Sequence, residues 1–180
     1  MKRLIQNHRD FFKSQQTKDV SFRKEYLKKL KVEIEKNEDL ICDAIYADFK
    51  KPRFETILSE TQFVLAELKT AINKIEKWST PKRVSSTWAN WPSSDFIYKE
   101  PYGAVLIIAP WNYPFQLVFA PLIGAIAAGN TAVVKPSEHT PNTSKIIVNI
   151  IEAIFPKEYV TVVEGDSTIS QQLLAERWDY

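Results

Sequence analysis

A polar amide and a Lys–Glu pair follow two apolar runs in the middle of this chain, and side chains of these types suit ligand chemistry. Asn112 comes after the run Val105–Ile108 and lies between Pro110 and Pro114. A side-chain amide is a neutral hydrogen-bond donor that can stabilise an oxyanion developing during a reaction. The prolines restrict the backbone and favour a fixed direction for the amide. We therefore predict that Asn112 is an oxyanion donor, with capping of a helix that starts near Pro114 as the alternative.

The second group, Lys135 with Glu138, follows the apolar run Thr131–Val134. A carboxylate after the second strand of a strand–helix–strand unit can accept hydrogen bonds from both hydroxyls of an adenosine ribose, and the lysine can donate to the same sugar. Two solvated surface charges are the alternative. The chain lacks the GxGxxG pattern that cradles a pyrophosphate, so spacing alone does not establish a cofactor site.

Alternating apolar runs and helical patterns from Pro101 onward predict the frame that carries both groups. This order is typical of an α/β fold whose parallel strands are joined by right-handed crossovers. Loops that leave the carboxyl ends of such strands form the ligand-binding edge of the sheet. The expected elements are strand Ala104–Ile108, helix Phe115–Ala128 with a left-handed cap at Gly129–Asn130, strand Thr131–Val134, helix Pro141–Phe155, strand Tyr159–Val163 and helix Ser167–Glu176.

Long amphipathic helices are predicted before this frame. All the glycines lie at or after Gly103, and the apolar residues of the first part recur at intervals of three and four. One helix is expected from Ser21, as its N-cap, to a stop at Pro52, and a second runs from Phe54 to Trp78. These helices should pack against each other and against the later domain.

Between the helices and the frame, the segment Lys82–Pro101 alternates apolar and polar residues and predicts a two-stranded ribbon. Trp78, Trp88 and Trp91 are expected to pack this ribbon. A two-stranded ribbon is not stable alone, so this one should need another surface, either from this chain or from a partner.

The composition is that of an ordinary globular protein, with 180 residues, 44% hydrophobic and 26% charged, and a net charge of +2. Basic and acidic residues are interspersed, so no nucleic-acid partner is expected.

The single cysteine, Cys42, excludes an intrachain disulfide, and its acidic neighbours disfavour a reactive thiolate. His8 and His139 are too far apart in the sequence to suggest a metal site, and both are expected to be surface residues. The apolar segments are too short for a membrane span or a signal peptide, which favours a cytoplasmic location.

Three segments, PYGAVLIIAPWNYPF, PLIGAIAAGNTAVVKPSEHTP and EYVTVVEGD, together resemble the aldehyde dehydrogenase family. The resemblance extends over essentially the whole chain and is strongest to the class 3-like branch, which includes fatty aldehyde dehydrogenases. It implies an N-terminal helical segment over residues 1–81, an oligomerisation-type β-ribbon over 82–100, and a partial Rossmann-like dinucleotide-binding sheet over 101–180.

The resemblance also implies roles for the residues at the predicted edge. Asn112 matches the donor to the oxyanion of a thiohemiacetal, and Lys135 and Glu138 match the pair that binds the adenosine ribose. The remaining matches are the backbone of Ile108, Ala109, Pro110 and Trp111 along the nicotinamide half of the cofactor, Tyr113 beside the substrate tunnel, and Gly165 near the adenine. The implied cofactor is NAD, with NADP possible, and the implied partners are a small-molecule aldehyde and a second copy in a homo-oligomer, a dimer, of the full-length enzyme.

The family reaction needs a cysteine thiolate to attack the aldehyde, a hydride transfer to the nicotinamide, and a glutamate to activate the water that releases the acid. Cys42 precedes the nucleotide-binding part and does not match that nucleophile. We therefore expect this chain to correspond to the N-terminal portion of such an enzyme, without its catalytic domain and inactive alone. A noncatalytic nucleotide-binding or subunit-interaction module, or a vestigial truncated protein, is the alternative.

Overall fold

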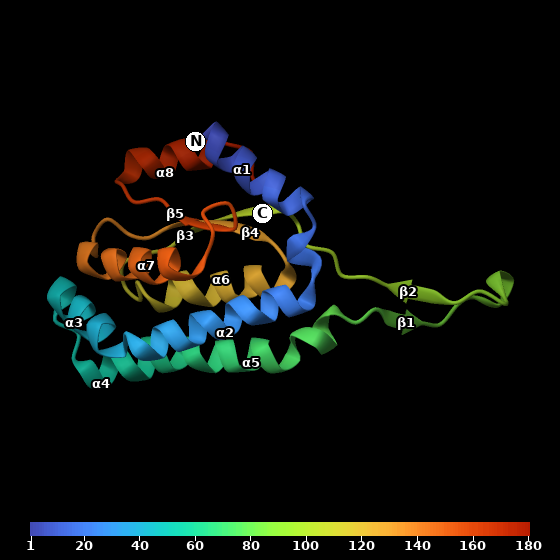
Figure 1. Ribbon diagram of the computed structural model, residues 1–180, viewed down its shortest axis with the longest axis horizontal. Coiled ribbons are helices and arrows are strands. Elements are labelled where there is room, and N and C mark those ends of the chain that lie inside the picture. The colour runs from blue at the N-terminus through green and yellow to red at the C-terminus, as the bar shows by residue number, and fades with distance from the viewer.

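The computed structural model describes all 180 residues and contains a three-stranded parallel sheet with helices on both faces (Figure 1). The strands lie in the order β3, β4, β5, as the alternation predicted, and α6 and α7 are the crossovers. Gly129 ends α6 with φ of 98°, the left-handed cap that was expected. The bounds are β3 (Ala104–Ile108), α6 (Gln116–Ala128), β4 (Thr131–Lys135), α7 (Pro141–Ile154), β5 (Val160–Val162) and α8 (Ser167–Leu174).

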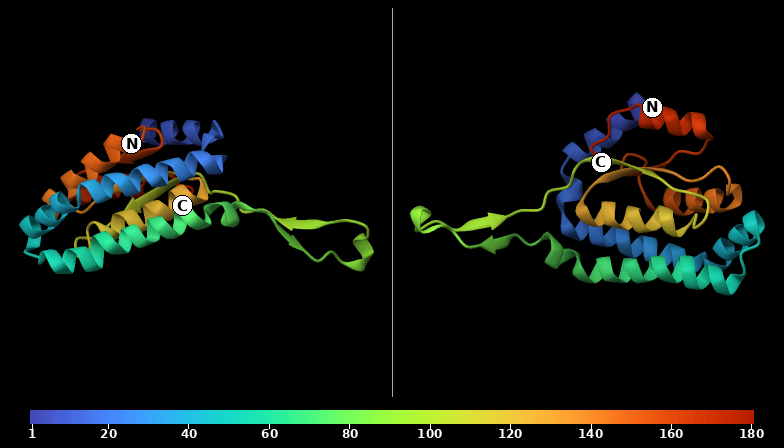
Figure 2. Two further views of the ribbon diagram at one scale, coloured as in Figure 1. Left: turned by 60° about the horizontal axis from the view of Figure 1, so that its bottom comes forward. Right: turned by 180° about the vertical axis from the view of Figure 1, so that it is seen from behind.

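The helices that precede the ribbon occupy two places. Most of them form an outer layer, and one of them covers a face of the sheet. Both α2 and α5 lie beneath α6 and α7, while α1 crosses the opposite face of the sheet beside α8 (Figures 1 and 2). The sequence patterns did not predict α1, whose apolar side is short and buries Ile5 and His8. The bounds are α1 (Lys2–Lys13), η1 (Gln16–Lys18), α2 (Val20–Lys36), α3 (Glu38–Phe49), α4 (Arg53–Thr56), the π-helical segment η2 (Ile57–Thr61) and α5 (Gln62–Ser79).

The predicted single helix from Ser21 to Pro52 is wrong in two respects. It breaks at Asn37, because the side-chain amide of Asn37 donates to the carbonyl of Glu33 at 2.8 Å and competes with the helical ladder. Its N-cap is Asp19, whose carboxylate accepts a hydrogen bond from the Ser21 amide at 2.8 Å. An aspartate one residue before the apolar pattern is an equally good capping residue.

A single core joins the outer helices to the sheet layer. Leu27, Ile45 and Ile75 from the first part are fully buried in the same cluster as Phe119 and Val134 from the second. The predicted packing of the long helices against the later part is therefore confirmed. None of the helices combines the length and the apolar character that crossing a bilayer requires.

The ribbon projects away from this body (Figures 1 and 2). Its strands β1 (Lys82–Val84) and β2 (Asp95–Ile97) pair antiparallel and are joined through η3 (Trp88–Asn90). Trp88 is 92% exposed and Trp91 is 83% exposed, so the expectation that they pack the ribbon is wrong within this chain. Strands of three residues offer no second layer against which an indole could be buried.

His8 provides a test of the packing between α1 and the sheet. The expectation that His8 is a surface residue is wrong, because α1 turns it toward the sheet, where it is buried and neither imidazole nitrogen has a side-chain or backbone partner within hydrogen-bond distance. Burial lowers the pKa of His8 from 6.5 to about 4, an effect that nearby Glu158 only partly opposes. The folded chain therefore takes up the proton at lower pH than the unfolded chain.

The free energy of unfolding should consequently fall by about 3 kcal/mol through His8 alone as the pH decreases from 6.5 to about 4. Urea denaturation at a series of pH values should show a shallower pH dependence over this window for His8→Leu than for the unsubstituted chain. Equal slopes for the two proteins would contradict the burial of a neutral imidazole.

Candidate functional site at the carboxyl edge of the sheet

The two predicted site loops lie side by side at the carboxyl edge of the sheet. Strands β3 and β4 are parallel neighbours whose last residues, Ile108 and Lys135, stand opposite each other. One step further, the amide of Ala109 donates to the carbonyl of Lys135 at 3.0 Å. The loop that carries Asn112 and the loop that carries Glu138 therefore leave the sheet at adjacent points.

The Asn112 loop presents its polar side chain outward. Trp111, Asn112 and Tyr113 are exposed, while Pro114 and Phe115 turn into the core. Phe115 is the N-cap of α6, and no side chain of the loop caps that helix. The structure thus contradicts the alternative in which Asn112 only caps the helix, and the amide is available at the edge of the sheet.

The cap of α6 comes instead from Glu60 in η2, a residue that sequence reasoning missed. One carboxylate oxygen, Oε2, accepts hydrogen bonds from the amides of Phe115 at 2.9 Å and Gln116 at 3.2 Å. The other oxygen, Oε1, accepts a hydrogen bond from the ammonium of Lys51 at 2.8 Å, and both side chains of this pair are buried. The Lys51 ammonium also lies 4.2 Å from the centroid of the Tyr113 ring.

Lys135 and Glu138 form a defined pair rather than two solvated charges. The Lys135 side chain is 1% exposed, and its ammonium lies 2.5 Å from the carboxylate of Glu138, which is one-third exposed. The hydrogen bond from Lys135 holds the pKa of Glu138 below its usual value. Glu138 therefore stays ionised and keeps acceptor capacity toward the solvent side, which is what two sugar hydroxyls require.

A small cavity of about 100 Å³ lies between the loops that follow β4 and β5. Gly165 in its wall has φ of 144°, and a Cβ there would lie 2.5 Å from a side-chain carbon of Ile169. Only glycine fits that backbone conformation and that approach. The cavity is lined by Pro136, Ser137, Glu138, Pro141, Ser144, Glu164 and Gly165.

Cys42 lies apart from these loops. Its side chain is buried within α3, and burial raises the pKa of the thiol. A thiol in this state is a poor nucleophile. No cluster of histidine, cysteine and acidic residues in the chain could hold a metal ion.

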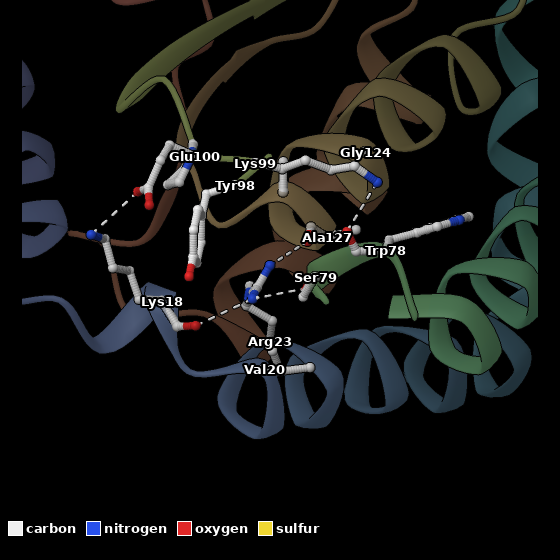
Figure 3. A pocket seen from close by; sticks show the side chains of 12 residues that line it. Lys18, Val20, Arg23, Trp78, Ser79, Tyr98, Lys99, Glu100, Gly124 and Ala127 are labelled. Atoms are coloured by element: carbon white, nitrogen blue, oxygen red, sulfur yellow. Dashed lines mark hydrogen bonds and ion pairs between the residues drawn. The ribbon is translucent and has the colours of Figure 1, made fainter. Parts of the chain in front are cut away.

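A second, larger hollow of about 460 Å³ lies at the base of the ribbon, near the C-terminal end of α6 (Figure 3). Buried Arg23 donates there to the carbonyl of Ala127 at 2.6 Å and to that of Lys18 at 3.2 Å. Lys18 pairs with Glu100 at 3.3 Å across the opening. These polar groups form hydrogen bonds and an ion pair with one another. The hollow lies at the junction of the helices and the ribbon, apart from the edge of the sheet where the two site loops meet.

The sequence matches a known family over nearly its whole length. The model of the aldehyde dehydrogenase family matches residues 1–178. The chain is 48% identical over 170 residues to 4,4'-diaponeurosporen-aldehyde dehydrogenase of Staphylococcus aureus. This alignment covers 94% of this chain and 37% of that protein. It is 38% identical over 172 residues to human aldehyde dehydrogenase family 3 member B1, covering 96% of this chain and 37% of that protein. The chain thus spans little more than a third of the length of these curated relatives.

Solved structures give the same picture of the fold. The substrate-bound state of Staphylococcus aureus AldH aligns with a TM-score of 0.94 and 46% identity, over 96% of this chain and 38% of that chain. Glyceraldehyde-3-phosphate dehydrogenase GapN from Methanocaldococcus jannaschii, complexed with NADP, aligns with a TM-score of 0.82 and 20% identity, over 99% of this chain and 39% of that one. At 20% identity, the likeness to the second structure concerns the fold alone. The two alignments confirm the predicted fold class.

Proposed function

Since this chain belongs to the aldehyde dehydrogenase family, we propose that it supplies the cofactor-binding and oxyanion-binding part of an aldehyde oxidation site. The observation that carries the proposal is the hydrogen bond from Ala109 to Lys135, which puts the Asn112 loop beside the Lys135–Glu138 loop. In this proposal the Asn112 loop contacts the oxygen of the reacting carbonyl, and the Lys135–Glu138 loop beside it binds the cofactor.

The chemistry follows from the groups at this edge. Asn112 donates its side-chain N–H to the oxygen of the aldehyde as that oxygen gains negative charge. Glu138 accepts hydrogen bonds from the two hydroxyls of the adenosine ribose, and Lys135 orients the carboxylate. The backbone from Ile108 to Trp111 would line the nicotinamide half of the cofactor, and Gly165, in the wall of the cavity beside Glu138, would border the adenine. The chemistry that a bound nicotinamide would supply is the acceptance of a hydride, after a cysteine from outside this chain has added to the carbonyl.

The cofactor proposal favours NAD over NADP. Glu138 is ionised, and its pKa is lowered by Lys135. A carboxylate placed at the ribose hydroxyls repels a 2′-phosphate, while Lys135 is already engaged by the same carboxylate and is buried.

The proposed substrate is an apolar aldehyde. Ile108 at the end of β3 and Trp111 and Tyr113 in the Asn112 loop are 41%, 58% and 38% exposed as residues, so an apolar surface lies beside the one amide of the loop. The Staphylococcus aureus relative is likewise named for an aldehyde, as 4,4'-diaponeurosporen-aldehyde dehydrogenase. We place the reaction in the cytoplasm, where a reduced lone cysteine such as Cys42 is normal.

These 180 residues alone are proposed to be inactive toward aldehydes. Their one thiol, Cys42, is buried in α3 and its pKa is raised, so no residue of this chain provides the thiolate that the reaction needs. The projecting ribbon with Trp88 and Trp91 is proposed to pack on a second copy in the assembled enzyme, because it exposes apolar rings that nothing in this chain covers.

A chimera tests the proposed function. Residues 1–178 of this chain replace the corresponding part of the Staphylococcus aureus relative, to which the chain is 48% identical over 170 residues. Aldehyde-dependent formation of NADH is followed at saturating aldehyde and varied NAD. In this chimera, Glu138→Ala should raise the KM for NAD about 10- to 100-fold, which is the usual loss for a hydrogen bond to a charged group.

The kcat of Glu138→Ala should stay within about 3-fold of the unsubstituted chimera, because the ribose contact is the same in the ground and transition states. Glu152→Ala, on the exposed side of α7, is the matched control and should leave the KM for NAD unchanged. An unchanged KM for NAD in Glu138→Ala would remove the assignment of Glu138 to the ribose.

A further inference from the structure

Two carboxylates of the N-terminal helices cap the two helices that follow the site loops. Glu60 accepts hydrogen bonds from the first amides of α6, directly after the Asn112 loop. Asp48, at the end of α3, accepts hydrogen bonds from the amides of Asn142 at 3.0 Å and Thr143 at 2.8 Å, in the first turn of α7 after the Lys135–Glu138 loop. Each site loop is thus held at its far end by an acidic side chain from a distant part of the sequence.

We propose that Glu60 is a positioning residue for the Asn112 loop. The first backbone amides of a helix have no hydrogen-bond partner within the helix and lie at the positive end of its dipole. A carboxylate that accepts their hydrogen bonds therefore holds the start of the helix in one position. Because these amides belong to Phe115 and Gln116, the fixed point lies three residues after Asn112. At its near end the loop is tied by the Ala109 hydrogen bond to β4.

Lys51 adds a second contact to this arrangement, one residue away from Asn112. It neutralises Glu60 in the interior, and its ammonium faces the ring of Tyr113, the residue next to Asn112. A cation over an aromatic face is attractive and depends on the position of the ring. The pair therefore constrains the loop at Tyr113 and at Phe115, on the side of Asn112 that leads into α6.

The π-helical turn η2 explains how Glu60 reaches this place. The extra residue of a π turn changes which side chains of a helix face inward, and such turns are frequent at functional sites. Glu60 lies within Ile57–Thr61 and is fully buried, although the other acidic side chains of the stretch α4–η2–α5 are exposed, namely Glu55, Glu67 and Glu76. A buried ion pair adds little net stability, so its hydrogen bonds to the α6 amides are its distinctive contribution.

The value of this positioning for catalysis rests on the proposed function, but the positioning itself can be measured in this chain without cofactor or aldehyde. Amide hydrogen exchange resolved by residue is compared for the unsubstituted chain, Glu60→Gln and Asp48→Asn. Glu60→Gln should speed exchange at Phe115 and Gln116 about 10- to 100-fold more than at Asn142 and Thr143, where any acceleration reports the general loss of stability from leaving Lys51 without its carboxylate.

Asp48→Asn is the reciprocal control and should show the reverse pattern, with faster exchange at Asn142 and Thr143 only. Equal acceleration at both helices in either variant would indicate a general loss of stability and would overturn the proposal, as would unchanged exchange at Phe115. If Glu60→Gln does not fold, Glu60→Asp, which keeps the charge but withdraws it, should show the same local acceleration. Failure of the chimera to turn over would affect the proposed function and leave this result untouched.

Discussion

Asn112→Ala in the chimera should lower kcat for aldehyde oxidation about 100- to 1000-fold, the usual effect of removing one oxyanion donor. The amide is exposed at the edge of the sheet and is not engaged in capping α6, so its loss removes no cap from the fold. The KM for NAD should stay within about 3-fold, because the contact develops only in the transition state. Initial rates of NADH formation measure both quantities.

The control for this substitution is Asn7→Ala, which removes an exposed amide from α1 and should leave kcat unchanged. A thermal unfolding curve for Asn112→Ala that matches the unsubstituted chimera establishes that only chemistry is affected. A loss in kcat smaller than about 3-fold would remove Asn112 from the role of oxyanion donor.

Lys51→Met should lower the free energy of unfolding of this chain by about 3–5 kcal/mol, the cost of leaving one partner of a buried ion pair alone. The carboxylate of Glu60 is fully buried, and the ammonium of Lys51, 2.8 Å away, is the cation that balances it. The same substitution removes the cation above the Tyr113 ring. Urea denaturation followed by circular dichroism measures the change.

Lys69→Met is the matched control, because Lys69 is exposed on α5 and its loss should change stability by less than about 0.5 kcal/mol. Lys51→Arg keeps the charge and should recover part of the stability. If Lys51→Met is no more destabilising than Lys69→Met, the pair is not the anchor that joins η2 to α6.

The sheet was predictable because its strands are covered on both faces. Continuous apolar runs marked Ala104–Ile108 and Thr131–Val134 as buried parallel strands, and the structure has strands there with the expected pairing. Gly129 was recognisable as a left-handed cap from its place after an apolar helix. Since parallel neighbours end at the same edge, the proximity of the Asn112 and Glu138 loops followed from the strands alone.

The parts that sequence reasoning missed depend on contacts between distant residues. Glu60 caps a helix 55 residues away, and Asp48 caps one 94 residues away. No local pattern marks an acidic residue as a cap for a helix elsewhere in the chain. The break at Asn37 and the π turn η2 are also local departures from a 3.6-residue period that continues on both sides. A periodic pattern therefore located the helices but did not reveal which carboxylates turn inward.

The turnover of the unsubstituted chimera tests the central claim most directly, because it asks whether this chain can furnish the oxyanion and ribose contacts of an aldehyde dehydrogenase. The measurement is aldehyde-dependent NADH formation by the purified, folded chimera, with the 180-residue chain alone as the blank. We expect a kcat within about 100-fold of that of the relative that donates the remainder, which allows for misfit at the junction. A chimera that folds and binds NAD but gives no more NADH than the blank would contradict the claim.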